Sequence, residues 1–413
     1  MRLPETKVLR DPIHGYVQIQ EEVIWKLIDT PEFQRLRRIR QLGGDLEVYH
    51  TAEHSRFAHS LGVYEICRRV VNEVPGVKET LSLLEQKAVL CAALLHDLGH
   101  GPFSHCYEDI SKTSHEDITQ WLILNRDGQV FQVLAKEDPA LPKLVTDILA
   151  HRSGCPLAED LISSQLDCDR MDYLLRDAYC TGTSYGSFDL ERVLRTLRVK
   201  DGILCVKRSG MHSVEDYIMA RYQMYWQVYL HPDAAGYELL VNAFFERYAR
   251  LRQKKQNRIA LLEPIYDCIF DPRRFYLLDD FSVLSGINQA QFANDPVLAD
   301  LAERIINRRL LEWKNESDLP NGPAAIQMLL DQMEQADFDP ELYFHRQTLR
   351  LDEYLPYREE NSIPIRILDQ EGGQEALKNL SACSTVVKAL LEMKETEITR
   401  LYFPKELKWP EQR

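Results

Sequence analysis

The sequence predicts a mainly α-helical fold, with small β-hairpins in a helical core and an α+β lobe at the C-terminal end. Up to about residue 260, most segments carry apolar residues at spacings of three and four, which is typical of helices packed on a core. Two stretches favour hairpins instead. From about Leu261 onward, shorter elements are separated by Pro-containing joints. The 413 residues suffice for two units, and we expect a core at 1–260 and a C-terminal lobe at 261–413.

The first predicted element is a hairpin at Val8–Ile19, where β-branched and aromatic residues flank an Asp-Pro pair and a glycine. Helical spacing then takes over in seven segments. The second of them follows Asp29 and Thr30, which suit a helix cap, and Pro31 suits its first turn. The predicted helices are Glu21–Ile28, Glu32–Leu42, Arg56–Glu73, Leu81–His96, His115–Leu124, Ala140–Ala150 and Ser164–Tyr179.

The helical pattern breaks at residues 182–186 (GTSYG). The next run alternates around Asp201 and Gly202, a pair that favours a two-residue hairpin turn. The elements predicted in this half are a hairpin at Val193–Lys207, helices over Ser213–Arg252, a helix at Glu375–Met393, and strands at Ile363–Leu368 and Glu397–Phe403.

Composition excludes several classes of function. The net charge of −14 argues against sequence-independent nucleic-acid binding, because such binding depends on Lys and Arg neutralising phosphates. The nine cysteines are scattered and form no C-x-x-C pair, so we expect reduced thiols. No apolar run reaches the roughly 18 residues of a membrane span, and the start lacks a signal-peptide pattern. We expect a soluble, cytoplasmic protein with no membrane or nucleic-acid partner.

Residues 96–105, HDLGHGPFSH, concentrate metal-binding side chains directly after the apolar run Val89–Leu95. His96 and Asp97 are adjacent, and His100 follows one turn later, so these side chains can converge on one point if the helix continues. A cation there would offset the cost of burying the carboxylate. The stretch therefore predicts a metal site.

One helix end rarely supplies every ligand of a divalent ion, so partners are expected elsewhere in the chain. His59 in HSRFAHSLGV and Asp169 in LDCDRMDYLLRD are the candidates. Singly, each such residue is more often a cap or a satisfied core residue. Together, His59, His96, Asp97 and Asp169 would hold one ion with positions left for water and substrate. Mn²⁺, Fe²⁺, Ni²⁺, Zn²⁺ and Mg²⁺ all remain candidates.

The order H…HD…D in RFAHSLG, LLHDLGHGPFSH and LDCDRMDYLLRD resembles the HD superfamily of metal-dependent phosphohydrolases. DPIHGYVQI, IDTPEFQRLRRIRQLGG and the spacing from HSRFAHSLG to HDLGHGPFSH resemble its deoxynucleoside triphosphate triphosphohydrolase branch, which includes the sterile-alpha-motif and HD-domain protein and bacterial relatives. The similarity covers roughly residues 7 to 250. It implies an HD-domain helical core and hydrolysis of a dNTP to deoxynucleoside and inorganic triphosphate.

The resemblance also implies roles for seven residues around the substrate. Read without it, Tyr173 and Tyr229 would be core aromatics and Asp177 a surface charge. The implied contacts are Arg56 and Arg170 with the phosphates, Tyr173 near the scissile phosphate, Asp177 with the sugar 3′-hydroxyl, Gln41 and Leu42 beside the deoxyribose, and Tyr229 where a 2′-hydroxyl would lie.

Three further histidines have a catalytic interpretation. The resemblance implies that His100, His105 and His115 surround the substrate and that one protonates the departing oxygen. His105 is the first candidate, because Glu108 follows it at one-turn spacing and can orient an imidazole. His115 begins a capping-box-like SHED sequence, so it also has a plain interpretation as a helix start.

A basic segment, FQRLRRIRQLG, suggests a second nucleotide site in this acidic chain, although a solvated helix face would have the same pattern. The resemblance implies a regulatory nucleotide site at a subunit interface, in which Asp29 forms hydrogen bonds with the edge of a guanine base. Arg10 stands where the human relative has asparagine. We expect a homotetramer assembled or activated by GTP or a dNTP, with a second Mg²⁺ bound alongside the nucleotide. The residues implied are Lys7, Val8, Asp29, Gln34, Arg35 and Arg37.

Two other functions fit part of the pattern. A nucleotidase or phosphodiesterase of the same superfamily would share the four ligands without requiring HGPFSH or DRMDYLLRD. A nucleotide-sensing or nucleic-acid-binding scaffold would use the metal only structurally, but the open coordination positions and the candidate proton donor argue against it.

Overall fold

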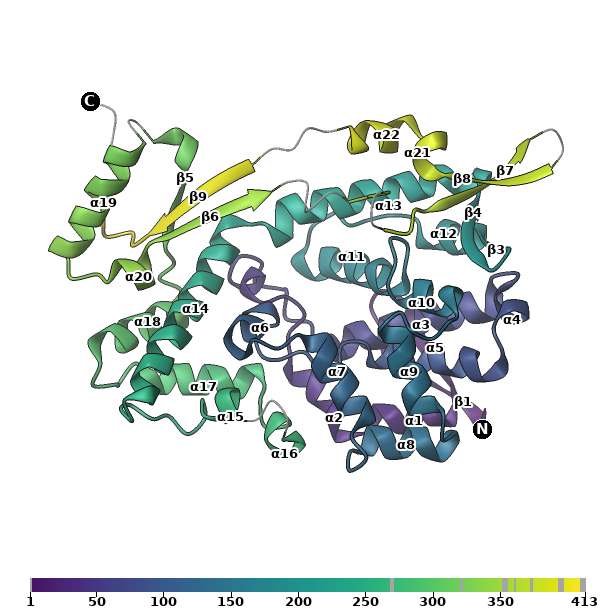
Figure 1. Ribbon diagram of the computed structural model, residues 1–413, viewed down its shortest axis with the longest axis horizontal. Helices are drawn as coiled ribbons and strands as arrows, with labels where there is room; N and C mark the ends of the chain where they lie inside the picture. Colours follow the sequence, from purple (N-terminus) through teal and green to yellow (C-terminus); the bar gives the residue numbers. More distant parts are fainter. Residues whose placement is uncertain are drawn as a thin grey trace.

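The computed structural model describes residues 2–267, 271–319, 322–350, 356–359, 362–371, 374–392 and 397–408. It is mainly helical with three small sheets, which confirms the predicted fold class. Figure 1 shows the helical core in the middle of the molecule and the C-terminal strands across one side of it.

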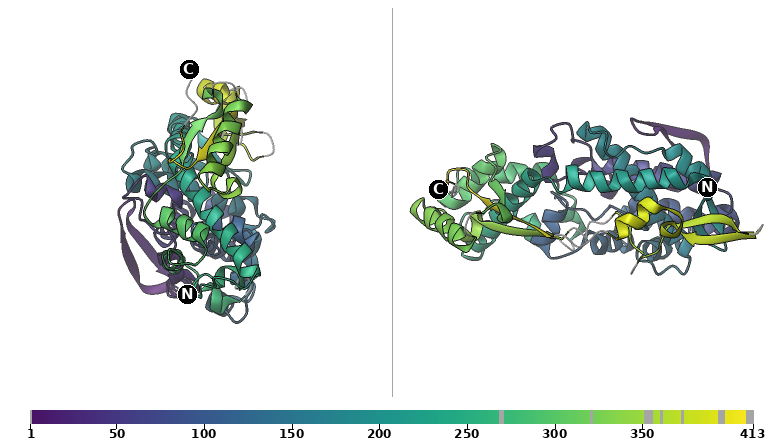
Figure 2. Two further views of the ribbon diagram at one scale, coloured as in Figure 1. Left: turned by 90° about the vertical axis from the view of Figure 1, so that its left-hand side faces the viewer. Right: turned by 90° about the horizontal axis from the view of Figure 1, so that it is seen from above.

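The N-terminal hairpin and the helix after it are present as predicted. β1 (Arg2–Asp11) and β2 (Gly15–Glu21) pair antiparallel and lead directly into α1 (Glu22–Ile28). Figure 2 shows this hairpin along the outside of the helical core. The turn that joins its strands contains residues 12–14.

The helix predicted at Glu32–Leu42 is wrong over its last part. α2 spans only Pro31–Arg35 and continues as a 3₁₀ turn, Leu36–Arg38. The chain then becomes extended, because its backbone pairs with the segment before the next helix: Gln41 N–H donates to His54 (3.0 Å) and Arg56 N–H donates to Ile39 (2.9 Å). A helix could not make these pairings.

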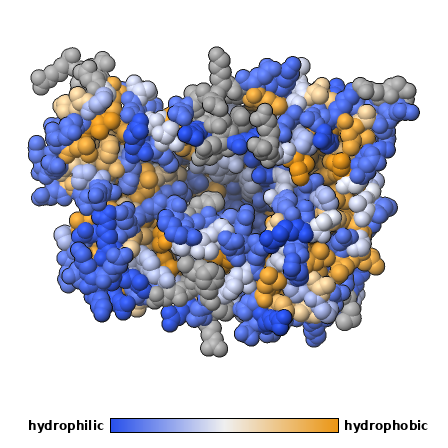
Figure 3. Space-filling view, viewed as in Figure 1, coloured by the Kyte–Doolittle hydropathy of each residue, from blue (hydrophilic) through white to orange (hydrophobic). Residues whose placement is uncertain are grey.

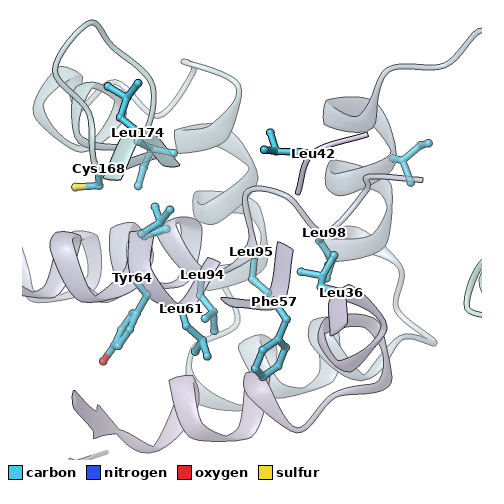
Figure 4. Packing of buried hydrophobic residues seen from close by; sticks show 14 of the residues in the cluster. Leu36, Leu42, Phe57, Leu61, Tyr64, Leu94, Leu95, Leu98, Cys168 and Leu174 are labelled. Carbon is cyan, nitrogen blue, oxygen red and sulfur yellow. The ribbon is translucent and has the colours of Figure 1, made fainter. Parts of the chain in front are cut away.

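Three helices form the centre of the core: α3 (Arg56–Glu73), α5 (Leu83–Leu95) and α11 (Cys168–Thr181). α3 matches its prediction, and a capping box of Ser82 and Glu85 starts α5. α11 begins four residues later than predicted, because Asp167 caps it by accepting from Arg170 N–H (2.7 Å). Figure 4 shows the apolar side chains between them, namely Phe57, Leu61 and Tyr64 of α3, Leu94 and Leu95 of α5, and Cys168 and Leu174 of α11.

Further short helices surround this centre. The helices predicted near His115 and Ala140 are confirmed as α7 and α9, whereas α8 and α10 had no prediction and the end of α12 lies where a hairpin was predicted. The bounds are α4 Val77–Thr80, α6 His105–Ser111, α7 His115–Leu124, α8 Gln129–Glu137, α9 Leu141–Leu149, α10 Pro156–Ile162 and α12 Leu190–Thr196.

The predicted central hairpin is confirmed by β3 (Leu197–Lys200) and β4 (Ile203–Lys207), although residues 193–196 belong to α12. Asp201 and Gly202 form its turn with φ of 53° and 77°, as the Asp-Gly pair predicts. The helical stretch that follows is α13 (Met211–Met224), a π-helical turn at Tyr225–Tyr229, and α14 (Pro232–Gln253).

The strands of the C-terminal segment divide between two sheets. β7 (Arg366–Glu371) pairs parallel with β4 of the core and antiparallel with β8 (Gln374–Asn379). β9 (Glu397–Phe403), which matches its prediction, lies between β5 (Glu312–Asn315) and β6 (His345–Arg350) in a second sheet. Figure 1 shows these sheets at opposite ends of the molecule, so the chain crosses it twice after residue 350.

The helix predicted at Glu375–Met393 is wrong at its start, because residues up to Asn379 pair with β7 as β8. Only α21 (Leu380–Cys383) and α22 (Thr385–Leu391) are helical there, and Met393 lies outside the described residues. The remaining helices are α15 Pro264–Asp267, α16 Pro272–Phe275, α17 Asp280–Ala290, α18 Pro296–Ile306, α19 Pro323–Gln335 and α20 Pro340–Tyr343.

Among the described residues, no helix combines the length and the apolar character that crossing a membrane would require. Figure 3 shows a largely hydrophilic face with a recess near its centre.

Candidate metal centre and substrate cavity

The four predicted metal ligands converge from three elements. α3 supplies His59, the chain directly after α5 supplies His96 and Asp97, and the first turn of α11 supplies Asp169. His59 Nε2 lies 3.3 Å from His96 Nε2, 2.9 Å from Asp169 Oδ1 and 3.8 Å from Asp97 Oδ2. His96 Nε2 lies 3.5 Å from Asp169 Oδ1 and 3.3 Å from Asp97 Oδ1.

The donor set fits a divalent ion. His59 donates from Nδ1 to Asp172 Oδ2 (2.8 Å), and His96 Nδ1 lies 3.0 Å from the Ala93 carbonyl oxygen. Each Nδ1 therefore has a partner that leaves Nε2 to face the same point. Two imidazoles and two carboxylates suit Mn²⁺, Fe²⁺ or a similar ion. The cluster can therefore hold a divalent metal ion.

The electrostatics of the cluster also favour a cation. Burial disfavours a charge on His59, but hydrogen bonds with Asp169 and Asp172 raise its pKa to about 10. Burial would raise the pKa of Asp97, but His96 and Arg56 hold it well below its usual range. Asp97 thus remains ionised although its side chain is buried, and a cation beside it would offset the cost of burying that charge.

A cavity of about 500 Å³ lies beside the cluster, a volume typical of small-ligand sites. Three of the four ligands, His59, Asp97 and Asp169, line it. The cavity also gathers most of the predicted substrate contacts. These are Gln41, Leu42, Arg56, Tyr173, Asp177 and Tyr229, together with His100 and His115.

The two predicted phosphate-binding arginines differ. Arg56 lines the cavity, where its guanidinium contacts Asp97 Oδ2 (2.5 Å) and donates to Ser104 Oγ (2.8 Å). Arg170 donates instead to Asp167 Oδ2 (2.8 Å) and is not among the residues that line this cavity. Arg170 would have to leave Asp167 to reach a phosphate.

Asp177 has a partner that sequence reasoning missed. Its Oδ2 accepts from the Tyr229 hydroxyl (2.8 Å), and its Oδ1 accepts from His54 Nε2 (2.8 Å). Burial disfavours a charge on His54, but the bond to Asp177 raises the pKa of His54 to about 9. His54 lies five residues before His59, and this closeness to a predicted ligand was the signal available for it.

Glu108 orients His115, a pairing that the sequence did not predict. The Glu108 carboxylate accepts from His115 Nδ1 and from the His115 backbone N–H (2.9 Å). The His115 ring stacks on His100 at 3.8 Å, with 17° between the ring planes. Burial and the nearby Arg56 lower the pKa of His100 well below its usual range, so His100 is neutral. The backbone of His105 begins α6, but its side chain lies outside the described part of the chain.

Asp97, His100 and His115 form a second group, whose candidate ligand atoms lie within 4.8 Å of one another. Asp97 therefore connects the first cluster to the stacked histidines.

Strands far along the chain supply one wall of the cavity, which the sequence did not reveal. Gln347 and Leu349 come from β6, and Arg400 comes from β9. Arg400 is fixed by donating from Nη1 to the Leu230 carbonyl (2.7 Å), just after the π-helical turn. Periodicity within a strand does not indicate which distant helix it will face.

The residues of the expected regulatory site lie in different places. Lys7 and Val8 are exposed on β1, while Asp29, Gln34 and Arg37 lie near the α1–α2 corner. Arg35 differs, because its side chain is 0% exposed and donates to the backbone carbonyls of Leu278 and His100, each at 2.8 Å. In this structure, Arg35 therefore supports the fold and does not face the surface.

Comparison with known proteins agrees with this geometry. Residues 56–177 match the HD domain, and residues 188–337 match the HD associated region. The protein YwfO of Bacillus subtilis (strain 168) is 42% identical over 98% of this chain and 94% of its own length. A crystal structure of a phosphohydrolase from Bacteroides thetaiotaomicron VPI-5482 superposes with a TM-score of 0.84 at 26% identity, covering 97% of this chain and all of that one.

Deoxynucleoside triphosphate triphosphohydrolase SAMHD1 of Homo sapiens is 30% identical over 54% of this chain. The chain spans only 42% of that protein's length. The Dictyostelium discoideum homologue is 28% identical over 75% of this chain and 60% of its own length. The matched HD domain contains all four converging ligands, and the chain belongs to the HD-domain phosphohydrolase family, with the HD associated region after the domain.

Proposed function

We propose that this chain hydrolyses deoxynucleoside triphosphates to a deoxynucleoside and inorganic triphosphate, using one divalent ion held by His59, His96, Asp97 and Asp169. The observation that carries the proposal is the cavity that His59, Asp97 and Asp169 line together with His115, whose Nδ1 donates to Glu108. The similarity to SAMHD1 proteins supports the substrate class. The ion, when bound, would supply Lewis-acid polarisation of the phosphoryl group and of the attacking water.

His115 is the proton donor to the departing 5′-oxygen in this proposal. Glu108 holds its Nδ1 and would stabilise the imidazolium form, as a carboxylate does in a catalytic dyad. The neutral His100 covers one face of the ring and keeps water from it. His105 remains a second candidate for this role.

The remaining cavity residues would bind the nucleotide. The guanidinium of Arg56 would stabilise charge on the phosphates, with Tyr173 beside it. Arg170 lies outside the cavity and would join them only by leaving Asp167. Asp177 would accept a hydrogen bond from the sugar 3′-hydroxyl. The Tyr229 hydroxyl is anchored on Asp177 at 2.8 Å, and its ring would oppose a 2′-hydroxyl, while Gln41 and Leu42 would lie along the deoxyribose.

The test is to incubate the four dNTPs and the corresponding ribonucleotides with Mn²⁺-loaded protein and to separate the products by anion exchange. Triphosphate and deoxynucleoside are the expected products. Pyrophosphate or monophosphate would overturn the position of attack, and turnover of only nucleoside monophosphates would indicate a nucleotidase. D169A should abolish turnover. H212A, which removes a highly exposed histidine of α13, should not change it.

We also propose that a nucleotide, GTP or a dNTP, activates a homotetramer of this chain, with a second Mg²⁺ bound to its phosphates. The exposed Lys7, Val8, Asp29 and Arg37 support this, and Gln34, which accepts from Arg37 Nε (2.8 Å), would orient that guanidinium. Sedimentation with and without each nucleotide tests it. An unchanged sedimentation coefficient and turnover rate with every nucleotide would refute regulated assembly.

A further inference from the structure

The turn of the N-terminal hairpin reaches into the core beneath the metal centre. Asp11 and His14, at either end of this turn, have side chains only 6% and 2% exposed. Asp11 Oδ1 accepts from the backbone N–H groups of Ile13 (2.9 Å) and His14 (3.0 Å), which fixes the turn itself. The tip of this surface hairpin therefore carries two buried polar side chains, while Pro12 and Gly15 stay exposed.

The tip is bonded to Asp172 of α11, which lies one helical turn after the ligand Asp169. His14 donates from Nε2 to Asp172 Oδ1 (2.6 Å). Arg176 donates to both carboxylate oxygens of Asp172 (2.8 and 2.9 Å) and from Nη1 to Asp11 Oδ2 (2.9 Å). Asp172 is fully buried, so its carboxylate depends on these protein groups and not on water for its hydrogen bonds.

Asp172 is also the residue that holds His59, since its Oδ2 accepts from His59 Nδ1 (2.8 Å). One carboxylate therefore joins the hairpin tip to a metal ligand. α3 makes room for this contact with Gly62, where a Cβ would lie 1.9 Å from Asp172 Oδ1 and 2.4 Å from Arg176 Nη2. Because Gly62 has no side chain, α3 leaves room for the buried pair of Asp172 and Arg176.

We propose that the hairpin tip positions the metal ligand His59: Asp11 and His14 orient Asp172 and Arg176, and Asp172 fixes the ring and tautomer of His59. Groups that orient ligating histidines typically change metal affinity by about 10- to 100-fold. The inference rests on the proposed metal site but does not depend on the substrate.

This arrangement also connects two sites of the proposed function. Val8 and Lys7 lie three and four residues before Asp11 on the same strand. A nucleotide held by the hairpin would act on its tip, and the tip acts on His59. The structure thus contains a short covalent and hydrogen-bonded path from the expected activator residues to His59, a residue of the proposed metal site.

The test is Mn²⁺ affinity, measured by electron paramagnetic resonance titration of free Mn²⁺ without any nucleotide. H14A should weaken binding about 10- to 100-fold. H14Q should restore most of it, because the amide keeps a donor for Asp172. Y16A, which truncates an exposed residue of the same hairpin, should bind like the wild type.

Equal affinity of H14A and the wild type would overturn the proposal. If H14A does not fold, D11N gives the same answer, because it leaves His14 in place and removes the charge that faces Arg176: weaker Mn²⁺ binding supports the proposal and unchanged binding overturns it. A wild type that binds Mn²⁺ but leaves every dNTP intact would refute the proposed reaction alone.

Discussion

Replacing Gly62 by alanine is the sharpest test of how tightly α3 and α11 must approach. The new Cβ would lie 1.9 Å from Asp172 Oδ1, and an ordinary contact needs about 3.4 Å, so the carboxylate or the helices must shift by about 1.5 Å. Neither neighbour can move freely, because Asp172 and Arg176 are both buried and are joined by two hydrogen bonds.

The magnitude follows from two opposing effects. Overpacking a core costs about 1–3 kcal/mol. Loosening the buried ion pair adds about 2 kcal/mol, roughly half of the 3–5 kcal/mol that breaking such a pair costs. The better helix propensity of alanine returns up to about 1 kcal/mol. We expect G62A to lower the free energy of unfolding by about 2–4 kcal/mol in urea denaturation and to weaken Mn²⁺ binding.

The matched control is G236A in α14. There a Cβ would meet only Tyr402 at 3.5 Å, an ordinary contact, so propensity should dominate and G236A should be neutral or slightly stabilising. A G62A protein as stable as the wild type, with the same Mn²⁺ affinity, would refute the close-approach reasoning.

Three further predictions concern the cavity. The pKa of His54 is raised to about 9 in the fold, so the stability that its bond to Asp177 contributes should be full below pH 6.5 and lost as pH rises through 9. The free energies of urea unfolding of the wild type and H54N should therefore differ by about 2–3 kcal/mol more at pH 6 than at pH 10. A difference that does not depend on pH would contradict the pairing. H115N should lower kcat about 10²- to 10⁴-fold with little change in KM, and E108Q should lower it by less, whereas a change confined to KM in either variant would exclude His115 as the proton donor. Chelation should lower the melting temperature of the wild type but not that of D169A, and equal shifts in the two proteins would show that the bound metal lies elsewhere.

The convergence of the four candidate metal ligands could be predicted from the sequence because they are rare residue types in a fixed order. His96 and Asp97 are adjacent, and His59 and Asp169 each stand in a polar motif, so the pattern identified all four before their distances were known. The predictions for α3, α7 and β9 succeeded for a related reason, since each is a long or strongly patterned segment whose local preference agrees with its packing.

The failures occurred where contacts between distant segments decide the structure. The chain after Arg38 leaves the helix to pair with residues near His54, and β8 forms because β7 lies beside it. The hydrogen bond of His115 to Glu108 across a loop was not predicted either. His54, Asp172 and Arg400 act through partners between 113 and 170 residues away, which spacing alone does not reveal.

The residues that β6 and β9 contribute to the cavity wall are separate in sequence from the residues proposed to carry out the reaction. All the groups proposed to carry out bond cleavage precede residue 180, whereas Gln347, Leu349 and Arg400 only bound the space in which a nucleotide would sit. Substitutions in these two strands can therefore reshape the chamber while leaving the reactive centre intact. Proteins with an identical HD motif can diverge in which nucleotide they accept through changes more than two hundred residues downstream of that motif.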